Sequence, residues 1–242
     1  MDLGIAGKTA VVTASSKGLG RASALALAAE GCNVAISARG EAALRETEET
    51  IRSLDVKVLA TVADVTQPEI PGWLVAEAGD RFGSVDILVA NAGGPPQAAA
   101  LDVSDEEIES AVNANLLTSV RLVREALPWM RRVGWGRIVL ITSSFIKQPA
   151  PSLALANTAR TGLWAWAKTA ASDLFGSGIT LNTVCPGAHA TDRMIELGGG
   201  DLSGMGDPED FGRIVAFICS RHTGYLSGAA INIDGTAVKG LL

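Results

Sequence analysis

Short apolar stretches rich in β-branched residues alternate with helical stretches along the chain, and this alternation limits the fold more than any other feature. Because most of the apolar stretches show no polar side, both faces of the sheet they form must be covered. Connections long enough to hold a helix favour parallel strands joined by right-handed crossovers. We therefore predict an α/β fold with a doubly wound parallel sheet and helices on both faces. The expected strands are 8–13, 33–37, 56–62, 85–90, 137–142, 179–184 and 230–233.

The helical stretches and the chain length complete this prediction. The 242 residues suit one large domain better than two small ones, so we expect a single Rossmann-type nucleotide-binding domain over 1–242. Residues 192–207 are rich in glycine, including Gly198-Gly199-Gly200, and predict a short, flexible lid over a substrate site. The expected helices are 18–30, 41–53, 69–82, 105–132, 153–175 and 208–220.

Composition excludes several classes of function. The net charge is −6 and Lys and Arg form no run, which argues against nucleic-acid binding. Three widely spaced cysteines and two histidines make a metal site improbable and predict reduced thiols. No apolar stretch reaches about 18 residues, and the N-terminus lacks the pattern of a secretory signal. We expect a cytoplasmic protein that binds a small-molecule substrate and neither nucleic acid nor membrane.

A glycine-rich turn follows the first expected strand and opens the first expected helix. Small residues let the backbone turn tightly and approach a phosphate, and the helix N-terminus offers free N–H groups and a positive dipole end. This position between a strand and a helix is the context that a dinucleotide-binding loop requires. The residues expected to contact the pyrophosphate are Thr13, Ser15, Ser16, Lys17, Gly18, Leu19 and Gly20.

The end of the second strand indicates which dinucleotide is preferred. NAD sites usually place an acid here for the ribose 2′-hydroxyl, but this chain has Arg39 between Ala38 and Gly40. Together with Lys17 in the phosphate loop, Arg39 would suit a 2′-phosphate. We therefore expect NADP(H) to be favoured over NAD(H).

The turn and several later motifs resemble those of the short-chain dehydrogenase/reductase family over nearly the whole chain. The turn is similar to the TGxxxGxG loop, with Ala14 in place of the first glycine. The resemblance implies further cofactor contacts and an assembly into homodimers or homotetramers through the two long helices and the last strand. The other matching residues are Asp64 and Val65, then Asn91, Ala92 and Gly93, then Asn115 and Ser143, and finally Pro186, Gly187 and Thr191.

Each match carries an expected role. In the family, the residue matched by Asp64 holds the adenine amino group, and that matched by Asn91 braces the central sheet. The Pro186–Thr191 segment resembles the one that grips the nicotinamide carboxamide. Asn115 matches an asparagine that helps to anchor a catalytic water, and Ser143 matches the catalytic serine.

The chain departs from the family at the Tyr-x-x-x-Lys pair. Thirteen residues after Ser143 the chain has Ala156 where the family has tyrosine, and four residues later it has Arg160 where the family has lysine. A lysine cation normally lowers the pKa of the phenol that donates a proton to the carbonyl oxygen. Alanine has no proton to donate, whereas Arg160 can still hydrogen-bond the nicotinamide ribose but stays charged at working pH.

Other groups could replace the missing phenol as a proton donor. His189 lies on the segment expected to line the nicotinamide, and histidine is a residue type that commonly acts as an acid, although a loop histidine bonded locally is the simpler interpretation. The expected catalytic set is therefore Ser143, Asn115, Arg160 and His189, and Arg160 is also a cofactor ligand. Arg193, in the lid, could meet an anionic substrate or form a surface ion pair.

Three functions remain open. The first is an NADP(H)-dependent oxidoreductase acting on a carbonyl or alcohol, similar to a 3-oxoacyl reductase but with a non-standard proton donor. The second is a nucleotide-binding protein without turnover, such as a regulatory subunit. The third is a non-redox enzyme on the same scaffold.

Overall fold

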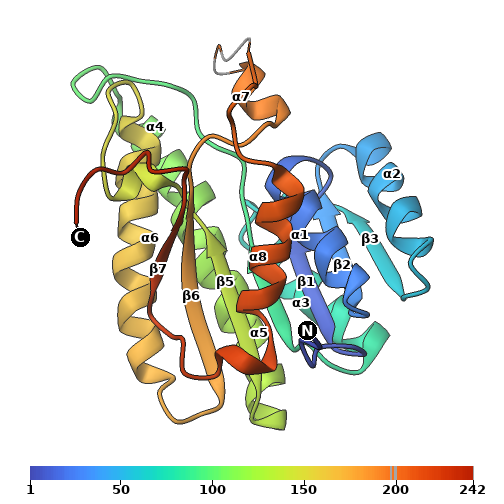
Figure 1. The fold of residues 1–242 in the computed structure, drawn as a ribbon. Helices are drawn as coiled ribbons and strands as arrows, with labels where there is room; N and C mark the ends of the chain where they lie inside the picture. The colour runs from blue at the N-terminus through green and yellow to red at the C-terminus, as the bar shows by residue number, and fades with distance from the viewer. Residues whose placement is uncertain (197, 199–200, 242) are drawn as a thin grey trace.

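The computed structural model describes residues 1–196, 198 and 201–241, and its centre is a seven-stranded parallel sheet (Figure 1). The strand order is β3-β2-β1-β4-β5-β6-β7. The strands after β1 are first added on one side of it and then, from β4 onward, on the other side, as in a doubly wound fold. The predicted fold class is therefore confirmed. The strands are β1 (Thr9–Thr13), β2 (Asn33–Ala38), β3 (Val58–Val62), β4 (Ile87–Ala90), β5 (Gly136–Ile141), β6 (Ile179–Pro186) and β7 (Ala230–Ile233).

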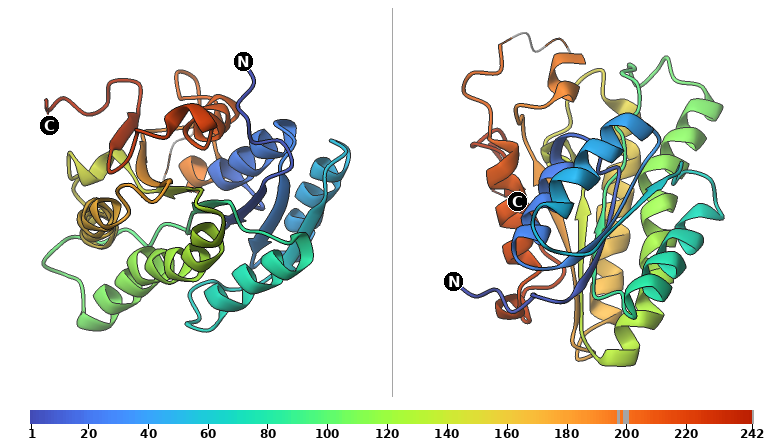
Figure 2. Two further views of the ribbon diagram at one scale, coloured as in Figure 1. Left: turned by 90° about the horizontal axis from the view of Figure 1, so that it is seen from below. Right: turned by 90° about the vertical axis from the view of Figure 1, so that its right-hand side faces the viewer.

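Helices cover both faces of the sheet, which gives three layers (Figure 2). Helices α1, α2 and α8 pack on one face through Leu27, Leu44 and Phe211, and α3, α5 and α6 pack on the other through Val75 and Leu163. All residues of β1, β4, β5 and β6 are buried, as the apolar strands predict. The helices are α1 (Gly18–Ala29), α2 (Glu41–Arg52), α3 (Ile70–Phe82), α4 (Asp105–Val112), α5 (Thr118–Val133), α6 (Ala154–Asp173), α7 (Asp192–Glu196) and α8 (Pro208–Ile218).

The helix expected over 105–132 contains a change of winding. A capping box between Ser104 and Glu107 starts α4, and a π-helical segment, Asn113–Leu117, separates it from α5. The Thr118 hydroxyl donates to the Asn113 carbonyl at 2.9 Å across this turn. Such π-turns are frequent at functional sites, and this one carries Asn115.

The expected lid is partly helical. Helix α7 occupies its first five residues, and a β-bridge between His189 and Gly206 closes the segment at its base. Of the three consecutive glycines that predict flexibility, Gly199 and Gly200 lie outside the described residues. Among the described helices, none combines the length and apolarity needed to cross a membrane.

Candidate functional site

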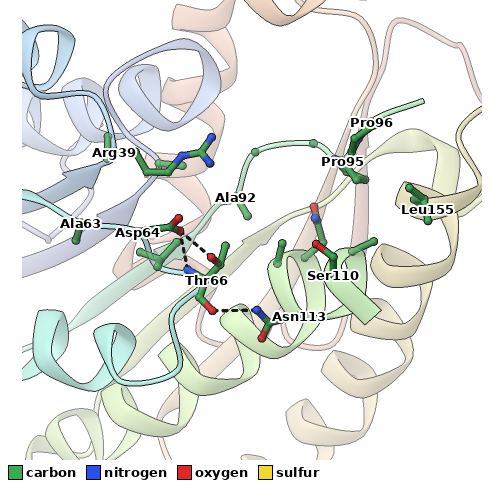
Figure 3. A pocket seen from close by; sticks show the side chains of 18 of the residues that line it. Arg39, Ala63, Asp64, Thr66, Ala92, Pro95, Pro96, Ser110, Asn113 and Leu155 are labelled. Atoms are coloured by element: carbon green, nitrogen blue, oxygen red, sulfur yellow. Dashed lines mark hydrogen bonds between the residues drawn. The ribbon is translucent and has the colours of Figure 1, made fainter. Parts of the chain in front are cut away.

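A cavity of about 720 Å³ lies at the carboxyl ends of β1, β2, β3 and β4, beside the point where the strand order reverses. Open α/β sheets bind ligands at this position, and the volume falls within the ~300–1,000 Å³ typical of small-molecule sites. Figure 3 shows the cavity between Arg39 and Asp64 at one end and Pro95, Pro96 and Leu155 at the other.

The loop between β1 and α1 is shaped to accept a phosphate. A Cβ at Gly20 would collide with the carbonyl oxygen of Ala14, so only glycine lets the backbone fold this tightly. No side chain caps the N-terminus of α1, where Lys17 is the N-cap residue, so its first N–H groups remain without a capping side chain. Ala14 itself has φ = 48°, a strained value for a residue other than glycine.

Thr13 and Ser15, two of the residues predicted to contact the pyrophosphate, form hydrogen bonds that hold the β1–α1 loop in place. The Thr13 hydroxyl donates to the Asn91 carbonyl at 2.7 Å and accepts from the Asn91 N–H at 3.0 Å. The Asn91 amide donates to the Ala14 carbonyl at 3.2 Å. The Ser15 hydroxyl is fully buried and donates to the Val12 carbonyl. The loop residues that line the cavity are Ala14, Ser16 and Lys17, and the cofactor contacts of all the predicted loop residues stay predictions.

Asp64 and Arg39 lie on opposite sides of the cavity at the β2–β3 end (Figure 3). The Asp64 carboxylate accepts hydrogen bonds from the Thr66 N–H at 3.0 Å and the Thr66 hydroxyl at 2.8 Å. Burial alone would raise the pKa of Asp64, but these bonds and the Arg39 guanidinium lower it below its usual value. The carboxyl is therefore an anion at neutral pH that accepts hydrogen bonds, as an adenine amino group requires.

The start of the lid contacts the phosphate loop between β1 and α1. Lys17 forms an ion pair with Asp192 at 3.1 Å, and both side chains are exposed. The Thr191 methyl group lies 3.5 Å from the position of a Cβ on Gly18. The end of the PGxxxT-like segment and the start of the lid thus lie against the phosphate loop.

Arg160 and Asn115 meet at the end of the site where the family has its catalytic pair. The Arg160 Nε donates to Asn115 Oδ1 at 3.1 Å, and its Nη1 donates to the Thr142 carbonyl at 2.9 Å. Burial, and to a smaller extent repulsion from Arg193, lowers the pKa of Arg160 from 12.5 to about 10. Even so, the guanidinium stays charged at neutral pH.

Asn115 has a second polar atom that is unused. Its side chain is 3% exposed and lines the cavity, yet its Nδ2 has no hydrogen-bond partner among the described residues. A buried donor without a partner costs free energy, so this amide is ready to donate to a ligand oxygen.

Ser143 follows Thr142, whose carbonyl accepts from Arg160, and caps the 3₁₀ turn Ser144–Ile146 after β5. Its Oγ accepts from the Phe145 N–H at 3.3 Å, and its hydroxyl proton remains able to donate. Ala156 stands on the first turns of α6, so the structure places no hydroxyl at the tyrosine position. The neighbouring Asn157 amide donates to the Ala150 carbonyl at 3.1 Å and so fixes the start of the helix.

His189 is packed into the protein. It is 5% exposed, its Nδ1 lies 3.1 Å from the Gly187 carbonyl, and its ring meets Phe211 edge-on at 5.2 Å. A Cβ on Gly206 would lie 2.9 Å from its Nε2. These contacts favour the local structural interpretation, and a role in proton donation stays a prediction.

The structure adds residues that sequence reasoning missed. The Asn113 amide donates to the Thr66 carbonyl at 2.9 Å and joins the π-turn to the adenosine end (Figure 3). Pro95 and Pro96 form the far wall of the cavity. The Asn-Ala-Asn sequence at 113–115 and the Pro-Pro pair after Gly94 were the available signals.

Comparisons with known proteins agree with this geometry. The family model described as short chain dehydrogenase matches residues 8–199. The chain is 31% identical to the 3-oxoacyl-[acyl-carrier-protein] reductase FabG of Staphylococcus epidermidis, covering 94% of this chain and 98% of the relative. It is 30% identical to human dehydrogenase/reductase SDR family member 4, covering 96% and 87%.

A solved structure is similar over the whole length. L-sorbose reductase from Gluconobacter frateurii, complexed with NADPH and L-sorbose, superposes with a TM-score of 0.94 at 31% identity and with 100% of both chains covered. The match of the family model across most of the chain, together with these relatives, confirms the resemblance found in the motifs. The chain belongs to the short-chain dehydrogenase family.

Proposed function

We propose that this chain is an NADP(H)-dependent oxidoreductase that interconverts a carbonyl compound and its alcohol, with a fixed cation in place of the usual phenol. The observation that carries the proposal is the pairing of Arg160 with Asn115 at one end of a cavity shaped for a dinucleotide. The names of the relatives support it, since they include a 3-oxoacyl reductase and a sugar reductase crystallised with NADPH.

The residues at the adenosine and phosphate end fit such a cofactor. Gly20 lets the loop between β1 and α1 fold tightly, the N-terminus of α1 has no side-chain cap, and Asp64 is an acceptor for an amino group. Arg39 and Lys17 line the same cavity and favour a cofactor that carries a 2′-phosphate. To reach that phosphate, Lys17 must give up its exposed ion pair with Asp192, which costs little because such pairs contribute about 0–1 kcal/mol.

Bound NADPH would supply the hydride in the reductive direction. As hydride reaches the carbonyl carbon, negative charge develops on the carbonyl oxygen. The Asn115 Nδ2 and the nearby Arg160 guanidinium would stabilise that charge by position and electrostatics, as an oxyanion hole does. Ser143 would add a hydroxyl donor, and the proton that completes the alcohol would come from water.

The first experiment is a calorimetric titration of NADPH and NADH into the purified protein. We expect NADPH to bind more tightly, and Arg39→Gln to weaken NADPH at least tenfold while leaving NADH unchanged. Arg213→Gln, an exposed arginine on α8 paired with Asp210, is the matched control. Failure of both nucleotides to bind would overturn the proposal.

A second function is favoured by one observation. Ala156 removes the phenol without a hydroxyl to replace it at that position, which suits a nucleotide-binding protein without turnover. NADPH binding without its oxidation, tested with acetoacetyl-CoA, L-sorbose, 2-oxo acids and simple ketones, would support this second function over the first.

A further inference from the structure

The end of the cavity that holds Asn115 and its partner Arg160, here called the reactive end, has hydrogen-bond donors and positive charge. In the described part of the chain, Arg160 donates to an amide oxygen and a backbone carbonyl, which are neutral acceptors, and no carboxylate pairs with it. The buried Nδ2 of Asn115 is a second donor without a partner among these residues. A half-buried cation that lacks a countercharge is costly unless a ligand supplies one.

A second guanidinium, that of Arg193 in the lid, lies beside the segment that follows β4. Arg193 on α7 donates from Nη2 to the carbonyl of Pro95 at 3.0 Å, a contact between residues 98 positions apart. The same atom would lie 3.2 Å from a Cβ on Gly94. Both Gly94 and Pro95 line the cavity, so Arg193 lies against its wall. The charge of Arg193 makes a smaller contribution than burial to the lowered pKa of Arg160.

The acids near these arginines are already engaged or lie towards solvent. Glu196 holds the outer side of Arg193 at 3.1 Å and is largely exposed. Asp64, on the far side of the cavity, is held by Thr66. Glu106 and Glu107 line the cavity from the exposed first turn of α4, where the Glu107 carboxylate accepts from the Ser104 N–H. In the described part of the chain, Arg160 and the Asn115 amide therefore have no carboxylate partner, whereas Arg193 has one, the exposed Glu196.

We propose that the substrate is an oxo acid whose carboxylate binds between Arg193 and Arg160, with its carbonyl oxygen towards the Asn115 amide. This inference rests on the proposed oxidoreductase function and adds the substrate class. Guanidinium groups match carboxylates in charge and in planar, two-pronged geometry. A bound carboxylate would neutralise the repulsion between the two arginines, which a neutral ketone cannot do.

Binding of unreactive analogues tests the proposal without relying on turnover. Oxamate and N-oxalylglycine mimic short and long 2-oxo acids, and each is titrated into the wild type with and without NADPH. We expect at least one to bind, the neutral diamide oxamide to bind at least tenfold more weakly than oxamate, and Arg193→Gln to weaken the acid tenfold or more. Arg193→Lys should recover part of the loss, and Arg213→Gln should have no effect.

The possible results distinguish failure of the oxo-acid proposal from failure of the proposed oxidoreductase function. Three results would each overturn the oxo-acid assignment while leaving NADPH binding and the reductase proposal intact. These are failure of both acids to bind, equal affinity for oxamate and oxamide, and an unchanged affinity for the acid in Arg193→Gln. Inorganic phosphate that competes with oxamate only at much higher concentration would support a carboxylate as the ligand, whereas tighter binding of phosphate would overturn it. Loss of NADPH binding in the wild type would instead count against the proposed function.

Discussion

Arg160→Met tests whether the guanidinium serves chemistry or the fold, because its contributions to stability nearly cancel. Two hydrogen bonds from this charged donor, to Asn115 and Thr142, contribute about 1.5–3 kcal/mol each. Against them, burial and repulsion lower its pKa from 12.5 to about 10, a charging cost of roughly 3 kcal/mol at about 1.36 kcal/mol per pKa unit. We therefore expect the free energy of unfolding to fall by no more than about 3 kcal/mol.

Activity should respond far more strongly than stability. Removing one donor of an oxyanion hole costs about 10²- to 10³-fold in kcat, and Arg160→Met removes the cation that also orients the Asn115 amide. The assay follows NADPH consumption with the best substrate from the panel, under single-turnover conditions, beside urea unfolding of the same preparation. We expect kcat/KM to fall about 100- to 1,000-fold while NADPH still binds.

Two further variants make the result decisive. Arg160→Lys keeps the charge but loses the forked geometry, so its activity should lie between those of the wild type and Arg160→Met. Arg213→Met removes an exposed arginine from α8 and should change neither activity nor stability by a measurable amount. If Arg160→Met kept activity within threefold of the wild type while remaining folded, the charge-stabilisation mechanism would be refuted.

Four other outcomes follow from the structure. Log kcat/KM for reduction should stay level from about pH 6 to 9 and decline as pH rises through the Arg160 pKa of about 10, because the cation is present below that value and lost above it; a decline centred well below that pKa would show that another group donates the proton. Ala156→Tyr combined with Arg160→Lys should raise kcat about 10²- to 10⁴-fold if the rest of the site supports general acid catalysis, and an unchanged rate would show that the site has diverged further. Arg39→Gln should bring the dissociation constants of NADPH and NADH, measured by calorimetry, within about threefold of each other, because one charged hydrogen bond contributes about 1.5–3 kcal/mol. Ala14→Gly should raise the free energy of unfolding, measured in urea, by up to about 1 kcal/mol, since relief of the positive φ outweighs the added freedom of the unfolded chain.

The sequence predicted the sheet because each strand has a strong local signal. Val11 and Val12 are apolar in succession, are buried, and pair with Leu88 and Val89 on the adjacent parallel strand. The loop glycines were equally readable, because Gly20 has no steric alternative beside Ala14. Where one residue type is required by backbone geometry or by burial on both sides, a single sequence carries enough information.

The reactive end could not be predicted to the same depth because its geometry depends on contacts between distant segments. The long helix over 105–132 was expected to wind evenly, and nothing in its apolar spacing indicated the π-turn that carries Asn115. The contact of Arg193 with Pro95 joins the lid to the segment after β4 and has no local signal. The interaction between Asn115 and Arg160 spans 45 positions and depends on how α6 packs against the π-turn.

The two departures from the family pattern, Ala156 in place of tyrosine and Arg160 in place of lysine, are explained by a single change of mechanism. A lysine at the position of Arg160 acts largely by lowering the pKa of the neighbouring phenol, so once the phenol is replaced by Ala156 that effect has nothing to act on. An arginine at the same position remains charged, holds Asn115 by its side-chain oxygen and leaves the amide nitrogen free to donate. Proton donation by a phenol would thereby give way to stabilisation by a charge that is present at neutral pH, with water as the proton source. On this reasoning Arg160→Lys in the presence of Ala156 lowers activity, whereas the same substitution beside Ala156→Tyr raises it. The sign of one substitution thus depends on the other, and a double-mutant cycle in kcat/KM measures that dependence.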